Sequence, residues 1–113
     1  MAVIIYHNPK CSNSRRALEI INASGTVPRV IDYQKQPLTR DELKALIAKM
    51  GVPVRDVVRS KEPLYASLQL ETANDDKLLD ALAAHPILLN RPIVVTDKGV
   101  KLCRPPEVVK SLL

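Results

Sequence analysis

The sequence predicts an α/β fold, a single domain over residues 1–113 with a small mixed four-stranded sheet and a helical insertion. Three observations predict it. A strand, a helix and a second strand follow one another at the start, amphipathic helices come next, and two strands joined by a tight turn precede a final helix. A chain of 113 residues fits one compact domain. Because 46% of the residues are hydrophobic and Phe and Trp are absent, the core is expected to be aliphatic.

The first three elements form a strand, helix, strand unit. Residues 2–6, AVIIY, are a short β-branched apolar run, which indicates a buried strand. Apolar residues then recur at helical spacing over residues 12–23, and Gly25 is a natural C-terminal cap for that helix. Residues 27–33 are a second strand candidate. A connection of this kind favours a parallel pair of strands.

Residues 39–86 are predicted to be a helical insertion between the strands. Thr39 and Glu42 have the spacing of a capping box, in which each side chain satisfies a free backbone N–H group of the other residue. The amphipathic helix that follows is expected to end at Gly51. Further helical pieces are expected at 54–59, 62–67 and 75–84.

The last part of the chain predicts two more strands and a helix. Residues 92–96 and 100–103 are the strand candidates, and Asp97-Lys98-Gly99 between them is a hairpin signal. Pro105-Pro106-Glu107 is typical of a helix start, with a proline in the first turn and an acid near the positive end. The complete order, β-α-β, helical insert, β-β-α, resembles a thioredoxin-like fold with an insertion.

Composition limits the partners and the compartment. The net charge of +5 suits an anionic partner, but no dense basic block or aromatic stacking surface is present, so we expect no nucleic acid. No signal peptide is visible and no apolar stretch reaches membrane-spanning length. We therefore expect a cytoplasmic protein without membrane association, whose two cysteines are reduced.

The segment HNPKCSNSRR, residues 7–16, predicts a reactive thiol at Cys11. Cys11 lies where a strand meets a helix, and the free N–H groups and dipole at a helix N-terminus favour an anion such as a thiolate. Arg15 and Arg16 add positive charge, and His7 would add more if it were protonated. The alternative is a buried structural cysteine, for which this polar loop is a poor place. Hydrogen-bond donors for a thiolate or a bound oxyanion are available from Asn8, Ser12, Asn13 and Ser14.

The second half of a C-x-x-C motif is missing, because Ser14 occupies the position of a resolving cysteine. A redox cycle would need an external thiol, or Cys103 brought close by the fold. Cys103 is most simply a strand residue packed in the core. His7, Cys11, His85 and Cys103 lack the short spacing of a metal-ligand pair, so no metal site is expected.

Arg59, Arg91 and Arg104 are candidate oxyanion ligands. Arginine presents a rigid fork of donors that suits tetrahedral oxyanions. Arg91 and Arg104 bracket the third and fourth strands, whose ends can come near the N-terminus of the first helix in this fold. Arg91-Pro92 before a buried strand is similar to the cis-proline that flanks the active site of thioredoxin-like folds.

Three segments resemble the glutaredoxin-linked bacterial arsenate reductases: residues 4–21, 37–65 and 85–109. The most specific motifs are HNP-x-C-x-x-S-R, NRPIVV and LCRP-x-E, in that order and spacing. The resemblance covers essentially the whole chain. The best-known members have C-G-T-S-R where this chain has C-S-N-S-R, so that Ser12 and Asn13 replace a glycine and a threonine.

The resemblance implies a reaction and its residues. Cys11 would attack arsenate and form a thiol-arsenate adduct, glutathione would attack next, and glutaredoxin would clear the mixed disulfide. Arg59, Arg91 and Arg104 match the arsenate-binding arginines. His7 matches a histidine that helps to lower the pKa of the thiol, and Ser14 and Arg15 would support the thiolate and the helix start. No bound metal or organic cofactor is implied, and we expect a monomer.

Two other functions stay open at this point. One is a glutathione-dependent thiol/disulfide reductase of another substrate, which would need Cys11 but not three oxyanion-binding arginines. The other is a non-catalytic thiol-based regulator of the same fold. Such switches carry C-x-x-C near the start of the chain, and Ser14 removes that pair here.

Overall fold

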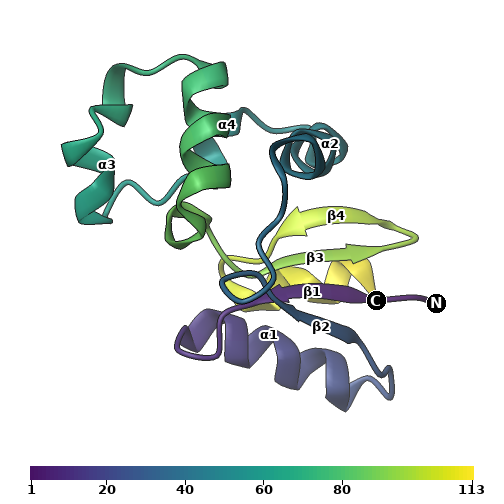
Figure 1. Ribbon diagram of the computed structural model, residues 1–113. Coiled ribbons are helices and arrows are strands. Elements are labelled where there is room, and N and C mark those ends of the chain that lie inside the picture. Colours follow the sequence, from purple (N-terminus) through teal and green to yellow (C-terminus); the bar gives the residue numbers. More distant parts are fainter. The chain divides into compact units, whose positions relative to one another are not determined.

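The computed structural model describes residues 1–113, which form two compact units (Figure 1). The strand unit consists of Met1–Gln36 and Arg91–Leu113, and the helical unit consists of Pro37–Asn90. The helical unit contains the predicted insertion, 39–86, with a few more residues at each end. The single domain over residues 1–113 stays a prediction. None of the helices combines the length and the apolar composition that crossing a membrane requires.

The strand unit is built on a mixed four-stranded sheet in the order β2-β1-β3-β4, which confirms the predicted thioredoxin-like architecture. β1 pairs with β2 in parallel and with β3 in antiparallel orientation, and β3 and β4 form the predicted hairpin. The strands are β1 (Ile4–His7), β2 (Arg29–Asp32), β3 (Ile93–Thr96) and β4 (Gly99–Leu102).

The register of the sheet brings four strand ends to one edge. His7 at the end of β1 is paired with Asp32 at the end of β2. Tyr6 is paired with Ile93 at the start of β3, and Ile93 is paired with Leu102 at the end of β4. We call this edge, where β1, β2 and β4 end and β3 begins, the site edge. In α/β sheets, ligands bind beyond the carboxyl ends of strands where the chain direction permits a crevice.

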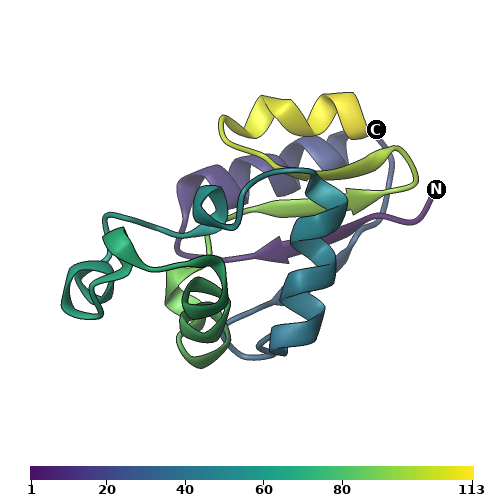
Figure 2. The same ribbon diagram turned by 90° about the horizontal axis from the view of Figure 1, so that it is seen from above.

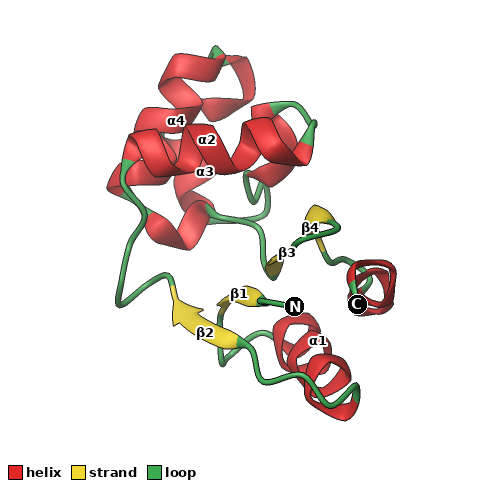
Figure 3. Cartoon of the chain, turned by 90° about the vertical axis from the view of Figure 1, so that its right-hand side faces the viewer, coloured by secondary structure: helices red, strands yellow, loops and turns green.

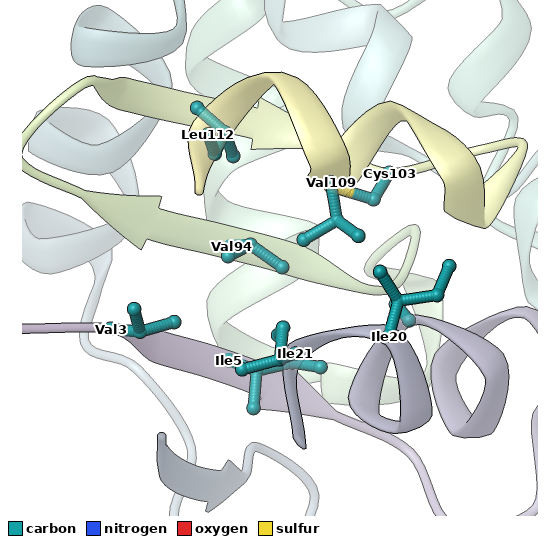
Figure 4. Close-up of a cluster of buried hydrophobic side chains, with 9 residues drawn as sticks. Val3, Ile5, Ile20, Ile21, Val94, Cys103, Val109 and Leu112 are labelled. Atoms are coloured by element: carbon teal, nitrogen blue, oxygen red, sulfur yellow. The ribbon is translucent and has the colours of Figure 1, made fainter. Parts of the chain in front are cut away.

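Helix α1 (Ser12–Ala23) and the 3₁₀ helix η4 (Pro106–Leu112) cover one face of this sheet (Figure 2). The predicted stop of α1 is confirmed, because Gly25 has a φ of 84° just after its end. Aliphatic side chains from both helices and from β1 and β3 fill the space between them (Figure 4). The core of the strand unit consists of Val3, Ile5, Ala17, Ile20, Ile21, Val94, Cys103, Val109 and Leu112.

The final helix was predicted without a helix type, and it is a 3₁₀ helix. Its buried residues, Pro106, Val109 and Leu112, are spaced by three. In a 3₁₀ helix, residues three apart lie directly above one another, so this geometry places all three on the sheet. A hydrogen bond also links η4 to β3, since the Thr96 hydroxyl donates to the Leu112 carbonyl at 2.8 Å.

All longer elements of the helical unit are helices, as Figure 3 shows by colour. Its two main helices, α2 (Arg40–Met50) and α4 (Asp75–Ala84), pack on each other through buried leucines and Ile47. The predicted helix at 75–84 is therefore confirmed. The predicted pieces at 54–59 and 62–67 are the shorter η1 (Val54–Val57) and α3 (Pro63–Ser67). Two short 3₁₀ helices complete the unit: η2 (Leu70–Thr72) and η3 (Pro86–Leu88).

The capping box predicted at the start of α2 is confirmed. The Glu42 N–H group donates to the Thr39 hydroxyl at 3.2 Å, and the Thr39 N–H group donates to the Glu42 carboxylate at 3.0 Å. These contacts lower the pKa of Glu42, chiefly through the bond from the Thr39 backbone. Gly51 ends the helix in the left-handed conformation, with a φ of 69°.

We predict that Thr39→Ala lowers the free energy of unfolding of the helical unit by about 1 kcal/mol, the usual loss for an N-cap hydroxyl. Urea denaturation followed by helical circular dichroism measures the change. Thr72→Ala removes an exposed hydroxyl whose hydrogen bond to the Gln69 carbonyl is long, at 3.5 Å, and the variant is expected to stay within about 0.5 kcal/mol of the parent protein. Equal losses in both variants would contradict the capping role.

Candidate active site

Hydrogen bonds of the loop before α1 hold Cys11 in place as the N-cap residue of this helix. The Cys11 N–H group donates to the Asn8 carbonyl at 3.0 Å, and the Lys10 N–H group donates to the Asn8 side-chain oxygen at 3.0 Å. Arg15, one turn into the helix, donates from Nη1 to the Pro9 carbonyl at 2.9 Å. The loop is thus tied both to itself and to the helix that it starts, which holds the thiol at one position.

The surroundings of Cys11 favour the thiolate. Partial burial acts to raise the pKa of the thiol, but the Ser14 N–H group, the Arg91 guanidinium and the Asn13 N–H group lower it by more, and the pKa lies below its ordinary value. Asn13 and Ser14 carry the helix-start N–H groups that an N-cap side chain normally satisfies. The sulfur makes no capping hydrogen bond of standard geometry, so these groups act on it electrostatically.

Arg91 lies beside the thiol at the start of β3, and its peptide bond to Pro92 is cis, as the resemblance to the cis-proline predicts. Two of its donors, Nε and Nη1, are buried and have no hydrogen-bond partner in the protein. Buried guanidinium donors without acceptors are rare, because each one loses its hydrogen bonds to water. Arg91 therefore offers unused donors for an anion next to a nucleophile.

Arg104 follows β4, which lies on the side of β3 away from β1, and its side chain extends toward the thiol. Its Nη1 donates to the Arg91 carbonyl at 2.9 Å and lies 3.9 Å from Cys11 Sγ. The second contact is long, so Arg104 contributes mainly an exposed positive charge near the sulfur. The register of the sheet explains why Arg91 and Arg104 lie close together, because the start of β3 and the end of β4 share the site edge.

His7 and Ser14 form a buried pair beneath the loop. The Ser14 hydroxyl shares a hydrogen bond of 2.6 Å with His7 Nδ1 and accepts one of 3.0 Å from the Asn8 N–H group. Burial lowers the pKa of His7, so the ring is neutral near pH 7 and does not supply the positive charge that protonation would give. Ser14 acts on the thiol through its backbone N–H group, whereas its hydroxyl orients His7 and the loop.

Cys103 is a core residue, as predicted, although it lies directly after β4 and not within the strand. It is fully buried against Val109 and other aliphatic side chains (Figure 4), and burial raises the pKa of its thiol to about 12. Both cysteines are free thiols. A thiol that stays protonated is a poor nucleophile for disulfide exchange, so Cys103 is not prepared to act as a resolving cysteine.

Arg59 belongs to the helical unit, where it follows η1. Its Nε lies 3.4 Å from a carboxylate oxygen of Glu62, and its N–H group donates to the Leu88 carbonyl at 2.7 Å. Its function as an anion ligand stays a prediction. Of the predicted residues, the strand unit brings together His7, Cys11, Ser14, Arg15, Arg91 and Arg104.

Tyr33, which follows β2 at the site edge, was not among the residues predicted from the sequence. Two features of the sequence could have identified it: the predicted parallel pairing of the first two strands, and the presence of a tyrosine at the end of the second strand. No group of three or more His, Cys, Asp or Glu side chains is arranged to hold a metal ion. The site edge therefore combines an activated thiol with donors for an anion.

Comparisons with known proteins agree on one family. Residues 6–112 match the ArsC family. The chain is 51% identical to an arsenate reductase of Escherichia coli (strain K12), across 98% of this chain and 80% of that protein. It is 48% identical to an arsenate reductase of Rhizobium meliloti (strain 1021), across 100% and 82% of the two chains.

A solved structure of an arsenate reductase from Vibrio cholerae is similar over the whole chain. The TM-score is 0.96 at 44% sequence identity, and the match covers 100% of this chain and 98% of that one. The fold is therefore similar to that of an experimentally determined relative.

We predict that iodoacetamide modifies one thiol of the native protein and two thiols after unfolding in urea, as counted by intact mass. Cys11 is partly exposed and has a lowered pKa, whereas Cys103 is fully buried and stays protonated. Cys11→Ser should react at least about 100-fold more slowly than Cys103→Ser under native conditions. Comparable rates for the two variants would refute the assignment of Cys103 to the core.

Proposed function

The chain belongs to the ArsC family, and on this premise we propose that it reduces arsenate to arsenite with the Cys11 thiolate as the nucleophile. Relatives of about half-identical sequence that carry the name arsenate reductase support the substrate. The observation that carries the proposal is the pair of buried, unpartnered Arg91 donors beside a thiol with a lowered pKa. A tetrahedral oxyanion would accept from those donors while its central atom faces the sulfur.

The reaction begins with attack on arsenic. The Cys11 thiolate gives an electron pair to pentavalent arsenic, and one arsenate oxygen takes up protons and leaves as water. The product is a covalent S–As bond, and no electrons have yet been transferred to arsenic. The N–H groups of Ser14 and Asn13 and the Arg91 guanidinium outweigh burial and lower the pKa of the thiol, which increases the fraction of thiolate available for this step.

The reduction takes place in the second step. The thiolate of glutathione attacks the Cys11 sulfur, the S–As bond breaks, and its electron pair stays on arsenic. Arsenic leaves in trivalent form as arsenite, and the two sulfurs, now oxidised, share a disulfide bond. A glutaredoxin thiol then attacks the glutathione sulfur and releases the Cys11 thiolate.

An external thiol is required because the chain has no second cysteine in a position to react. Ser14 occupies the place of a resolving cysteine, and Cys103 is buried with its pKa raised to about 12. Glutathione and glutaredoxin supply the two electrons in this proposal. No bound metal or organic cofactor takes part.

The remaining residues hold the anion and the loop. Arg91 and Arg104 would bind arsenate oxygens and compensate the charge of the adduct. Arg59 is proposed as a third arsenate ligand. His7 and Ser14 fix the loop from below through their 2.6 Å hydrogen bond, and Arg15 fixes it through the Pro9 carbonyl.

A glutathione-dependent disulfide reductase is the second candidate. The partly exposed Cys11 with its lowered pKa is the feature that favours it, because such a thiolate also attacks mixed disulfides. It leaves the buried Arg91 donors unexplained, and for this reason we place arsenate first.

The test is NADPH consumption in a coupled assay with arsenate, glutathione, glutaredoxin and glutathione reductase. We expect turnover that depends on arsenate, a loss of at least about 10³-fold in Cys11→Ser, and a change of less than about twofold in Cys103→Ser. Substantial turnover in Cys11→Ser would refute the mechanism.

If arsenate supports no turnover while Cys11 stays reactive, the second candidate replaces the first. An assay with glutathione and glutathione reductase but without glutaredoxin, whose own thiol attacks such disulfides, then measures reduction of a glutathionylated peptide, with Cys11→Ser as the control. Turnover with the peptide and none with arsenate would therefore reject arsenate as the substrate.

A further inference from the structure

Tyr33 completes the set of residues that the strands deliver to the site edge. It follows Asp32, the last residue of β2, which is paired with His7 at the end of β1. The end of β1 leads to Cys11, the start of β3 follows Arg91, and Arg104 lies two residues after β4. β2 is the remaining strand, and Tyr33 is what it places at this edge.

The hydroxyl of Tyr33 is buried without a hydrogen-bond partner. The residue is 1% exposed, and its phenol oxygen contacts no donor or acceptor with hydrogen-bond geometry. A phenylalanine would fill the same space without placing a polar atom out of water, and buried polar groups are nearly always paired. Packing alone therefore explains the ring of Tyr33 but not its hydroxyl.

The hydroxyl lies within electrostatic reach of the proposed site. Burial raises the pKa of Tyr33, Arg91 acts to lower it, and Cys11 acts to raise it. The net direction is upward, so the phenol keeps its proton and is a neutral donor at physiological pH. The side chains of Gln34 and Asn8 also favour the phenolate, although neither forms a hydrogen bond to it.

Three buried side-chain N and O atoms in the protein lack a partner: Tyr33 Oη, Arg91 Nε and Arg91 Nη1. All three carry protons that they can donate, and both residues act on the Cys11 thiol or are acted on by it. Independent packing defects would be scattered over the two units. Their concentration at one edge beside one thiol indicates a common acceptor, which a tetrahedral oxyanion provides.

We propose that the Tyr33 hydroxyl donates a hydrogen bond to the oxyanion that Cys11 attacks, which makes Tyr33 a substrate-binding residue. The identity of the oxyanion rests on the proposed function, whereas the binding of an oxyanion at this place does not. Because the Tyr33 hydroxyl is a neutral donor, it orients the bound oxyanion without adding positive charge to the site. It fixes one oxygen of the anion from the β2 side, while Arg91 binds from the β3 side.

The test is Tyr33→Phe, which removes the hydroxyl alone, made in a Cys103→Ser background. Inorganic phosphate is the probe, because it has the shape and charge of arsenate and is not reduced. Protection of Cys11 from iodoacetamide gives the phosphate concentration at half protection. We expect this concentration to rise about tenfold or more in Tyr33→Phe, as for a lost hydrogen bond to a charged group.

Stability separates this binding role from a structural one. Tyr33→Phe removes an unpaired buried hydroxyl, so its urea midpoint should stay the same or rise. Tyr65→Phe is the matched control, because the Tyr65 hydroxyl accepts from Arg55 Nη1 at 2.8 Å in the helical unit. That variant should lose stability and keep the phosphate protection of the parent protein.

Unchanged protection in Tyr33→Phe would overturn the proposal, as would weaker protection accompanied by a fall in its urea midpoint, because the hydroxyl would then have a structural role. Protection in the parent protein without arsenate turnover would reject the proposed function and still leave the Tyr33→Phe comparison decisive. Failure of both phosphate and arsenate to protect the parent protein would reject the oxyanion site and Tyr33 together.

Discussion

The pairing of β1 with its two neighbours is the constraint on which the site depends. β1 is parallel to β2 and antiparallel to β3, and β4 is antiparallel to β3. This combination brings the ends of three strands and the start of the fourth to one edge. Residues from four distant parts of the chain meet there as a result: Cys11, Tyr33, Arg91 and Arg104. A register shift of one residue in β3 would turn its core-facing side chains toward the other face.

The chemistry of the site is decided by a competition at the Cys11 sulfur. Burial favours the neutral thiol, and it is the largest single effect. The N–H groups of Ser14 and Asn13 and the Arg91 guanidinium together outweigh it, so the pKa is lowered. Cys103 shows what burial does without such groups, since its pKa is raised to about 12. Cys11 and Cys103 carry the same thiol group, and only the difference in their environments makes Cys11 a nucleophile and Cys103 a core residue.

Local signals made the elements predictable, and non-local contacts limited the prediction of the site. The capping box at Thr39 and the hairpin at Asp97-Lys98-Gly99 each depend on a few adjacent residues, so the sequence was sufficient. Cys11 was found because its polar loop is unsuited to a buried cysteine. Tyr33 was not predicted, because its position at the site edge depends on the β1–β2 register. The 3₁₀ geometry of η4 depends on how Val109 and Leu112 fit the sheet.

The pKa of Cys11, measured from the pH dependence of iodoacetamide alkylation in Cys103→Ser protein, tests whether the helix start and Arg91 form an anion site at this sulfur. We expect an inflection below that of an unperturbed cysteine. The pKa should rise when Arg91→Ala is added, because a charge that favours the thiolate is removed. An ordinary or raised pKa in the parent protein, or no increase on loss of Arg91, would contradict an anion site formed by the helix start and this arginine.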